Sequence, residues 1–431
     1  MADRRAEALA AVLEDVRARL APGLAFVLWD GRRVPADADP HATAIAIRDP
    51  GAVARLLRRP RLDTFVRLHL GGRIDFENGG LLELARLRPA GKAGRILRTL
   101  DRRRLARGLA AFAFAPGGEP LMAAAGPGDG ALRDGSEATN KANVAHHYDV
   151  SNAFYALFLD PGMVYTCAYF DGWHDDLARA QRDKLEMVCR KLRLAPGERL
   201  LDIGCGWGAL LMHAAEHHGA VGVGVTLSEA QAALARARIA QRGLAGRIEI
   251  RLADYTRMED RFDKICSIGM FEQVGLANHA TYFAAVHRLL QPGGLYLHHA
   301  ITRRARASER AFRKMPAEYR ALTRYIFPGG ELDHIGMTVK NLEVHGFEVH
   351  DVEGWREHYA RTTRLWTQRL QARRAEAVAE AGERVTRAWL LYLAGVSLAF
   401  ERRGAYIFQT LASRRTRDPS PLPPTRRDLY R

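Results

Sequence analysis

The stretch Arg199-Leu-Leu-Asp-Ile-Gly-Cys-Gly-Trp-Gly-Ala209 decides the fold of the larger part of this chain. Apolar residues lead into Gly204, Gly206 and Gly208, and leucines and alanines then recur at helical spacing over residues 210–215. This order is typical of a buried strand, a tight turn and a helix start, because glycines tolerate positive φ and let a ligand approach the backbone. The unpaired amides at such a helix start bind anionic groups, so we expect a ligand at this turn.

Strands and helices alternate after this turn. Strands are expected over residues 221–225, 248–252, 262–268, 295–301 and 347–352, and helices over 176–194, 228–241, 278–290, 336–345, 359–381 and 383–402. The alternation predicts an α/β fold with a mostly parallel sheet and helices on both faces. Ligands of such sheets lie at the carboxyl ends of the strands.

The length of 431 residues suits two domains. We predict a small N-terminal α+β domain over 1–115, a Gly/Pro/Ala-rich linker over 116–139, the α/β domain over 140–412 and a basic, Pro-rich tail over 413–431. In the first domain, strands are expected over 24–28, 42–47 and 74–78, and helices over 9–20, 50–57, 81–87 and 95–109.

The formal net charge of +16 favours an anionic partner, either nucleic acid or a membrane surface with acidic lipids. The alternative is a coding bias, since arginine is scattered along the whole chain. Cys167, Cys189, Cys205 and Cys266 form no Cys-x-x-Cys pair, so we expect no metal, no disulfides and a reducing compartment. The N-terminus lacks the apolar core of a signal peptide, and the longest apolar run, 389–400, is too short to span a bilayer. We therefore expect a cytoplasmic protein that associates peripherally with the inner face of the membrane.

Several motifs are specific when they are taken together. They are Asp-Ile-Gly-Cys-Gly-x-Gly at 202–208, Tyr-Asp-Val-Ser-Asn at 148–152, Tyr-Thr-Cys-Ala-Tyr-Phe at 165–170, Gly-Val-Thr-Leu-Ser at 224–228, Gly-Met-Phe-Glu-Gln-Val-Gly at 269–275, Leu-His-His-Ala-Ile at 297–301 and Tyr-Ile-Phe-Pro-Gly-Gly at 325–330. The first resembles the first motif of class I S-adenosylmethionine (SAM) methyltransferases. The set, over about residues 140–410, resembles the cyclopropane-fatty-acyl-phospholipid synthases and mycolic-acid methyltransferases.

This resemblance implies a SAM site built at the strand ends. Glycines would face the methionine end, a Thr–Gln pair would take the ribose where many methyltransferases have an acidic residue, and an Asp-Tyr pair suits adenine. The residues so implied are Tyr165, Thr166, Asp202, Gly204, Gly206, Thr226, Gln231, Asp254 and Tyr255. Helix capping at Thr226 and Gln231, and a core aromatic at Tyr255, are the structural alternatives.

The resemblance also implies that a cis double bond of an acyl chain is methylated through a carbocation, which then loses a proton. Aromatic faces tolerate such a cation. Those available are Tyr165, Tyr169, Phe170 and Phe271. The partner would be a phospholipid membrane with unsaturated acyl chains, and the sequence leaves a homodimer open.

The family is thought to use bound bicarbonate as the base. The residues that resemble its holders are Cys167, Glu272, His299, Tyr359 and the backbone of Ile301. Glu272 would accept the proton and pass it on through His299, which titrates near neutrality.

Each of these catalytic assignments has a structural alternative. Cys167 also suits a small buried hydrophobe and His299 a core histidine. His298 is adjacent, but strand alternation sends the two imidazoles to opposite faces. Glu272 is harder to explain structurally, because a buried carboxylate needs a partner. The family more often has His where this chain has Gln273.

Other functions compete with cyclopropanation. The same carbocation could lose a different proton and give a methyl- or methylene-branched chain. A nucleic-acid methyltransferase is disfavoured, because the Asn/Asp-Pro-Pro-Tyr/Phe motif is missing after the fourth strand. A non-catalytic lipid-binding protein is the third alternative. The N-terminal domain loosely resembles a sterol-carrier-like domain that contacts lipid or membrane, and a purely structural domain is an equal alternative.

Overall fold

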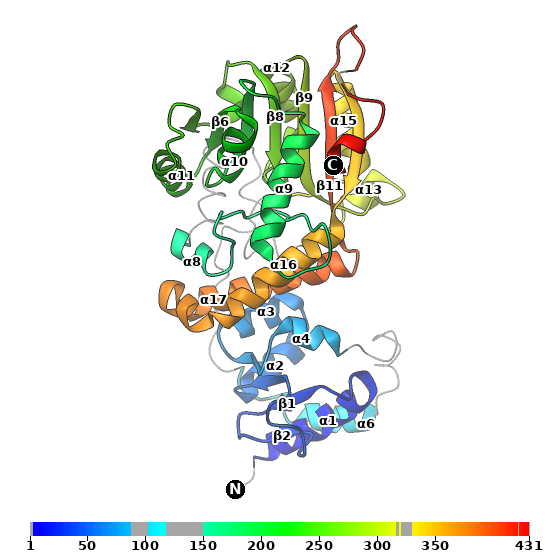
Figure 1. The fold of residues 1–431 in the computed structure, drawn as a ribbon. Coiled ribbons are helices and arrows are strands. Elements are labelled where there is room, and N and C mark those ends of the chain that lie inside the picture. Colours follow the sequence, from blue (N-terminus) through cyan, green and yellow to red (C-terminus); the bar gives the residue numbers. More distant parts are fainter. Residues whose placement is uncertain are drawn as a thin grey trace. The chain divides into compact units, whose positions relative to one another are not determined.

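The computed structural model describes residues 3–87, 102–117, 150–315, 319, 330–420 and 422–430, and it contains two compact units (Figure 1). The larger unit takes its described residues from Gly126–Met315, Ile326–Glu380 and Ala399–Arg431. The smaller unit takes its described residues from Met1–Ala125, Pro316–Tyr325 and Ala381–Leu398. We expected this last segment within the 140–412 domain, so the structure divides the chain differently there.

A seven-stranded sheet forms the core of the larger unit (Figure 1), and its strand order is β10-β11-β9-β8-β5-β6-β7. The strands are β5 (Arg199–Ile203), β6 (Val221–Thr226), β7 (Ile248–Leu252), β8 (Phe262–Ile268), β9 (Leu290–Arg303), β10 (Phe347–Gly354) and β11 (Ala405–Arg414). The neighbours from β7 to β9 pair in parallel, whereas β11 is antiparallel to both β9 and β10. The mostly parallel sheet is therefore confirmed.

We did not expect β11. Its buried residues include Gln409, Thr410 and Ser413 as well as apolar side chains, so polar residues interrupt the apolar run by which a buried strand is usually found. It lies between β10 and β9 and completes the sheet next to the motif at 297–301.

Helices cover both faces of this sheet. The helices of the larger unit are α8 (Asn152–Ala156), α9 (Leu177–Lys191), α10 (Ala209–His218), α11 (Glu229–Gln241), α12 (His279–Leu289), α13 (Glu309–Phe312), α15 (Ile335–Val344) and α16 (Arg356–Ala372), with short 3-10 turns η2 (Tyr255–Arg257), η3 (Phe271–Gln273) and η4 (Leu276–Asn278). One apolar cluster joins α9, α10 and α11 to Leu200, and a second joins α12 and α15 to Leu201. Adjacent strand residues thus face opposite layers, as strand alternation requires.

The smaller unit combines helices with a four-stranded sheet of order β2-β1-β3-β4. Its elements are α1 (Arg4–Leu20), β1 (Ala25–Val27), β2 (Arg33–Val34), β3 (Ala44–Ile47), α2 (Pro50–Arg58), α3 (Leu62–Leu70), β4 (Ile74–Glu77), α4 (Leu81–Arg86) and α6 (Arg102–Ala110). The sequence did not predict β2 or α3. Asp49 caps α2 by accepting a hydrogen bond from the Ala52 amide at 3.0 Å, as the Asp-Pro start of this helix suggests.

The long helices after β10 break at two places. We expected one helix over 359–381, but α16 ends at Ala372 and α17 (Arg374–Glu401) begins two residues later. Within α17, Gly382 has φ 81° and ψ 161°, which interrupts the helix where we predicted a stop. Arg387, which follows the break, pairs with Asp75 at 2.8 Å, and this contact ties its segment to the smaller unit.

The C-terminal tail is docked on the larger unit. Leu429, in η5 (Arg427–Tyr430), is buried, and its carbonyl accepts a hydrogen bond from Arg190 at 3.2 Å. Asp428 pairs with Arg193 at 3.1 Å. Most of the expected linker (118–139), part of the helix expected over 95–109, Tyr148, Asp149 and residues 325–329 lie outside the described residues.

No helix in the described part of the chain combines the length and the apolar character needed to cross a membrane.

Candidate functional site

The glycine turn after β5 has the backbone conformation that its sequence predicts. Gly204, Gly206 and Gly208 have φ values of 81°, 53° and 79°. A Cβ atom added at Gly204 would lie 2.8 Å from Met270 Cβ, whereas one at Gly206 would meet nothing within 4 Å. Packing therefore requires the first glycine, and the second faces open space.

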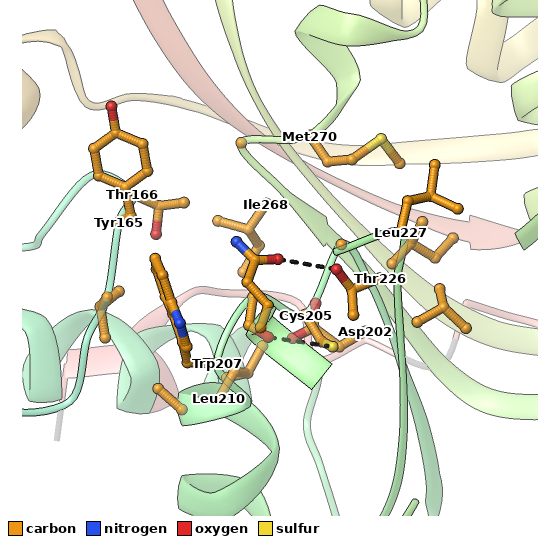
Figure 2. Close-up of a pocket in the computed structure, with 18 of the residues that line it drawn as sticks. Tyr165, Thr166, Asp202, Cys205, Trp207, Leu210, Thr226, Leu227, Ile268 and Met270 are labelled. Carbon is orange, nitrogen blue, oxygen red and sulfur yellow. Dashed lines mark hydrogen bonds between the residues drawn. The ribbon is translucent and has the colours of Figure 1, made fainter. Parts of the chain in front are cut away.

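A cavity opens at the carboxyl ends of β5, β6, β7 and β8 (Figure 2). All nine residues that we predicted to bind SAM line it: Tyr165, Thr166, Asp202, Gly204, Gly206, Thr226, Gln231, Asp254 and Tyr255. They come from the ends of β5, β6 and β7, from the first turn of α11 and from the segment before α9. The structure therefore brings the whole predicted set to one hollow.

The polar pair expected at the ribose position is joined within this cavity. The Thr226 hydroxyl donates to the Gln231 side-chain oxygen at 2.9 Å, as a dashed line in Figure 2 shows, and both residues are buried. Ser228 caps α11, because its hydroxyl oxygen accepts a hydrogen bond from the backbone N–H of Gln231 at 3.3 Å. Since Ser228 supplies the cap, capping does not explain the two buried side chains.

The pair expected at the adenine position forms another wall. Asp254 Oδ1 accepts from the backbone and hydroxyl of Thr256 at 2.8 and 2.7 Å, which caps η2. The Tyr255 ring contacts Tyr282 edge-on, with 5.5 Å between the ring centroids. Both residues line the cavity, so the core contact of Tyr255 and its place at the cavity coexist.

Two side chains of α9 hold the segment that borders the cavity, and neither was predicted from the sequence. The Gln181 amide donates to the carbonyls of Val164 and Thr166 at 3.3 and 2.9 Å. Lys184 Nζ donates to Thr166 Oγ1 at 3.1 Å and lines the cavity. The signal was available, because polar residues three apart lie on the buried face of the predicted 176–194 helix, next to Leu185.

Lys184 is also unusual because its ammonium group is buried. Burial lowers its pKa to about 8, against the opposing influence of Asp202 and Asp160. Burial raises the pKa of Asp202 to about 6, and Cys266 Sγ donates to its carboxylate at 3.4 Å. The cavity wall therefore holds a buried cation near a buried carboxyl group.

Glu272 sits in η3 and is buried. Its Oε1 accepts from the Ile301 amide at 2.6 Å, and its Oε2 is a buried atom without a hydrogen-bond partner among the described residues. Burial raises the pKa of Glu272 to about 7. The Ile301 N–H, which the resemblance offered to an anion, is engaged by Glu272.

His298 and His299 face opposite sides of β9, as strand alternation predicts. His298 Nδ1 lies 2.9 Å from the Tyr296 hydroxyl, whereas His299 Nδ1 lies 3.2 Å from the Gln409 amide nitrogen. The His299 ring packs edge-on against Trp355 at 5.2 Å.

The prediction that His299 titrates near neutrality was wrong. Its side chain is fully buried, and burial, followed by the nearby Lys184 and Lys191 cations, holds its pKa well below the ordinary value. Within the described residues, no hydrogen bond joins His299 to Glu272. A relay from Glu272 through a cationic His299 is therefore not supported.

The other expected catalytic residues lie near Trp355. Cys167 is fully buried, its Sγ lies 3.9 Å from the Trp355 carbonyl oxygen, and burial raises the pKa of its thiol. The Tyr359 amide donates to the same carbonyl at 3.1 Å, and its ring packs on Trp366. The five predicted catalytic residues do not line the cavity themselves, but Thr166 and Gln273, next to Cys167 and Glu272, do.

Of the four aromatic rings that we expected near a carbocation, Tyr165 lines the cavity. Phe271 packs against Tyr282 in the apolar cluster that joins α12 and α15 to the sheet. Tyr169 and Phe170 stack on His358. The structure thus places one of the four at the cavity.

We expected no metal ligands. Two groups of described residues nevertheless bring ligand atoms within 4.8 Å of one another: Cys189, His213 and His218, and Asp171, His174 and Asp183. In the first group, Glu186 Oε2 lies 3.0 Å from the Nε2 atoms of both histidines. These imidazoles thus already have a carboxylate partner.

Comparison with known proteins agrees with the motifs. The family model for mycolic acid cyclopropane synthetase matches residues 136–410. The chain belongs to this family. As a member of the mycolic acid cyclopropane synthetase family, it is a SAM-dependent methyltransferase with a class I methyltransferase fold. The family, the fold class and the type of enzyme that the motifs predicted are confirmed.

The relatives differ in how much of this chain they cover. A "probable fatty acid methyltransferase" of Pseudomonas putida is 35% identical over 411 residues, which cover 95% of this chain and 96% of the relative. The cyclopropane-fatty-acyl-phospholipid synthase of Escherichia coli K12 is 38% identical over 268 residues, or 62% of this chain and 66% of that protein. A crystal structure of a mycolic acid cyclopropane synthase complexed with SAH and CTAB aligns with a TM-score of 0.59 and 36% identity, covering 63% of this chain and 98% of the other.

Proposed function

We propose that this methyltransferase adds the methyl carbon of SAM to the cis double bond of a phospholipid acyl chain and closes a cyclopropane ring. The observation that carries the proposal is the convergence of all nine motif-derived residues on one cavity at the strand ends. The synthases among its relatives support the ring product.

Within that cavity each group has a role that suits SAM. SAM supplies an electrophilic methyl group when it is bound. The open space beside Gly206 lets a ligand approach the backbone, and the Thr226–Gln231 pair offers polar atoms to the ribose. Tyr255 offers a ring face to adenine. The helix start after the glycine turn favours the ligand's carboxylate.

We further propose that the proton leaves with the help of a bicarbonate held near Glu272 and His299. Both side chains carry a buried polar atom without a partner among the described residues, Glu272 Oε2 and His299 Nε2, and such atoms fit a polar ligand. The cations Lys184 and Lys191 lie close enough to His299 to depress its pKa, and they favour an anion there. Bicarbonate would supply a base, and His299 would hold it as a neutral imidazole.

Methyl branching is the second candidate, because the relative that covers nearly the whole chain is named a fatty acid methyltransferase. Here the carbocation loses a proton from a different carbon. Gln273, which lines the cavity where the family more often has His, is the residue best placed to alter the product.

Lipid mass spectrometry of cells that express the protein separates these outcomes. A cyclopropane product adds one CH₂ and removes the alkene, whereas a methylene-branched product stays unsaturated. The catalytically inactive control is a Gly206→Val variant, which should leave the lipids unmodified. Unchanged acyl chains in cells with soluble, SAM-binding wild-type protein would contradict the proposal.

We propose that the phospholipid is reached from an anionic membrane surface. The segment after β9 exposes Arg304, Arg306, Arg310, Arg313 and Lys314, and the chain carries a net charge of +16. Each such cation near an acidic surface contributes about 1 kcal/mol, and salt weakens the attraction.

Vesicle co-sedimentation tests this surface directly. The double variant Arg304→Gln/Arg306→Gln should weaken binding to anionic vesicles by about 2 kcal/mol, or roughly 30-fold, at low salt. The exposed pair Arg402 and Arg403 serves as the matched control. Equal losses in both double variants would argue against this docking segment, and equal binding to neutral vesicles would argue against electrostatic docking altogether.

A further inference from the structure

A chain of buried polar contacts runs from β10 to His299. Glu353 on β10 forms an ion pair with Lys191 at the end of α9. Lys191 Nζ donates to Gln409 Oε1 at 2.7 Å, and Gln409 Nε2 lies 3.2 Å from His299 Nδ1. Lys191, Gln409 and His299 are each no more than 1% exposed, so water does not compete for these contacts.

The chemistry of Lys191 determines which way the Gln409 amide points. An ammonium group has three donors and no acceptor, so it must face the amide oxygen. Burial lowers the pKa of Lys191, whereas Glu353 and the Trp355 ring, whose centroid lies 5.2 Å from Nζ, favour its charged form. With the amide reversed, its NH₂ group would face the ammonium and leave two buried donors unsatisfied, at a cost of about 1–3 kcal/mol each.

The amide in turn determines the proton position on His299. Because Gln409 presents its NH₂ group to Nδ1, this nitrogen must accept the hydrogen bond. A neutral imidazole carries one proton, so the proton resides on Nε2. Nε2 is the buried nitrogen that has no partner among the described residues.

We propose that Lys191 and Gln409 are positioning residues that fix His299 in the Nε2–H tautomer, so that this nitrogen presents a hydrogen-bond donor to an anion at the reacting centre. The role in turnover rests on the proposed function, whereas the tautomer itself does not. Cys167, which shares Trp355 with His299, provides no competing partner for Nδ1, because its Sγ contacts the carbonyls of Ala168 and Trp355.

Nitrogen-15 NMR of the full-length protein, labelled at histidine, reads the tautomer directly. The His299 signals are assigned by their loss in a His299→Gln variant. We expect a protonated Nε2 and an unprotonated Nδ1 throughout the neutral pH range. A proton on Nδ1 in the wild type would overturn the proposal without any further variant.

Gln409→Glu tests the cause of the tautomer. The carboxylate keeps the contact with Lys191 but can only accept, so His299 should switch to the Nδ1–H form. Turnover should fall, by up to the roughly 10²–10⁴-fold that a positioned base commonly contributes, because the bicarbonate base loses the donor that holds it, and the SAM dissociation constant should stay unchanged. Gln368→Glu, the same change at an exposed position of α16, should leave the tautomer and the rate as in the wild type.

Lys191→Met is a second variant that tests the same cause if Gln409→Glu does not fold. It keeps the apolar stem and removes the donor that orients the amide, so signals of both tautomers should appear. A switched tautomer with unchanged turnover would overturn the positioning role. By contrast, a wild-type protein with the Nε2–H tautomer that modifies no lipid would refute the proposed function and leave the tautomer assignment intact.

Discussion

Glu272→Gln separates the proton-accepting role of this side chain from its structural role. Gln keeps the shape and keeps an oxygen that can accept from the Ile301 amide, as Glu272 Oε1 does at 2.6 Å. It loses the ability to ionise in a buried site. The substitution therefore changes proton binding while it preserves the contact that anchors η3 to β9.

The pKa of Glu272 sets the size of the effect on stability. Burial raises it to about 7 from an ordinary value of 4.5. Between these two pH values the folded protein holds a proton that the unfolded chain has lost, so the free energy of unfolding falls as pH rises. Each pKa unit corresponds to about 1.4 kcal/mol, which gives a penalty of roughly 3 kcal/mol that is complete above pH 7 and absent below 4.5.

Chemical unfolding at pH 4.5 and at pH 8 measures this penalty. Relative to the wild type, Glu272→Gln should gain roughly 3 kcal/mol of stability on going from the lower to the higher pH. Asp333 adds to the wild-type slope, because burial and the Glu272 carboxylate raise its own pKa to about 7. Glu343→Gln, the same change at an exposed position of α15, is the control. If Glu272→Gln kept the wild-type pH dependence, Glu272 would ionise normally and the reasoning from burial would be wrong.

Activity gives the second measurement on the same variant. Glu272 would accept the proton that bicarbonate removes, and a group that transfers a proton commonly contributes about 10²–10⁴-fold in rate, so turnover should fall by this amount with SAM affinity unchanged. In the wild type the rate should rise with pH through about 7, as Glu272 loses its proton. Removal of dissolved carbonate should slow the wild type, and added bicarbonate should restore it. Wild-type turnover by folded Glu272→Gln would show that the base lies elsewhere.

The cavity and the helix break give three further predictions. Gly206→Ala should weaken SAM binding at least tenfold in calorimetry, because the added Cβ enters the open space of the cavity. Gly243→Ala is the control, since Gly243 has a similar φ of 69° and open surroundings but lies outside the cavity lining, and its SAM binding should stay unchanged. Lys184→Met removes the donor to Thr166 and should weaken SAM binding about fivefold, the value of a hydrogen bond near 1 kcal/mol; unchanged affinity would mean that Gln181 alone holds the segment. Gly382→Ala should lower the free energy of unfolding by about 1–3 kcal/mol, since its φ of 81° and ψ of 161° suit glycine alone, and equal denaturation midpoints would refute this.

The grouping of the residues predicted to bind SAM could be foreseen, because most of them lie at the end of a strand that the sequence marks clearly. Parallel strands place their carboxyl ends at one edge of the sheet, so residues as distant as Gly204 and Asp254 converge without any knowledge of side-chain contacts. By contrast, β11 was missed because its buried positions mix polar Gln409, Thr410 and Ser413 with apolar residues, so no continuous apolar run marks the strand.

The same polar strand explains why the chemistry of His299 was harder to predict than its position. The motif at 297–301 places an imidazole at a strand end, and a solvated imidazole titrates near neutrality. The protonation state of the His299 imidazole depends on Gln409, 110 residues away along the chain, and on Lys191, 218 residues from Gln409. Burial removes the charge from the imidazole, and two hydrogen bonds to an intervening amide then leave one nitrogen for the proton. A sequence motif can specify which atom reaches the site, but the protonation of that atom is determined by partners that only the folded sheet brings together.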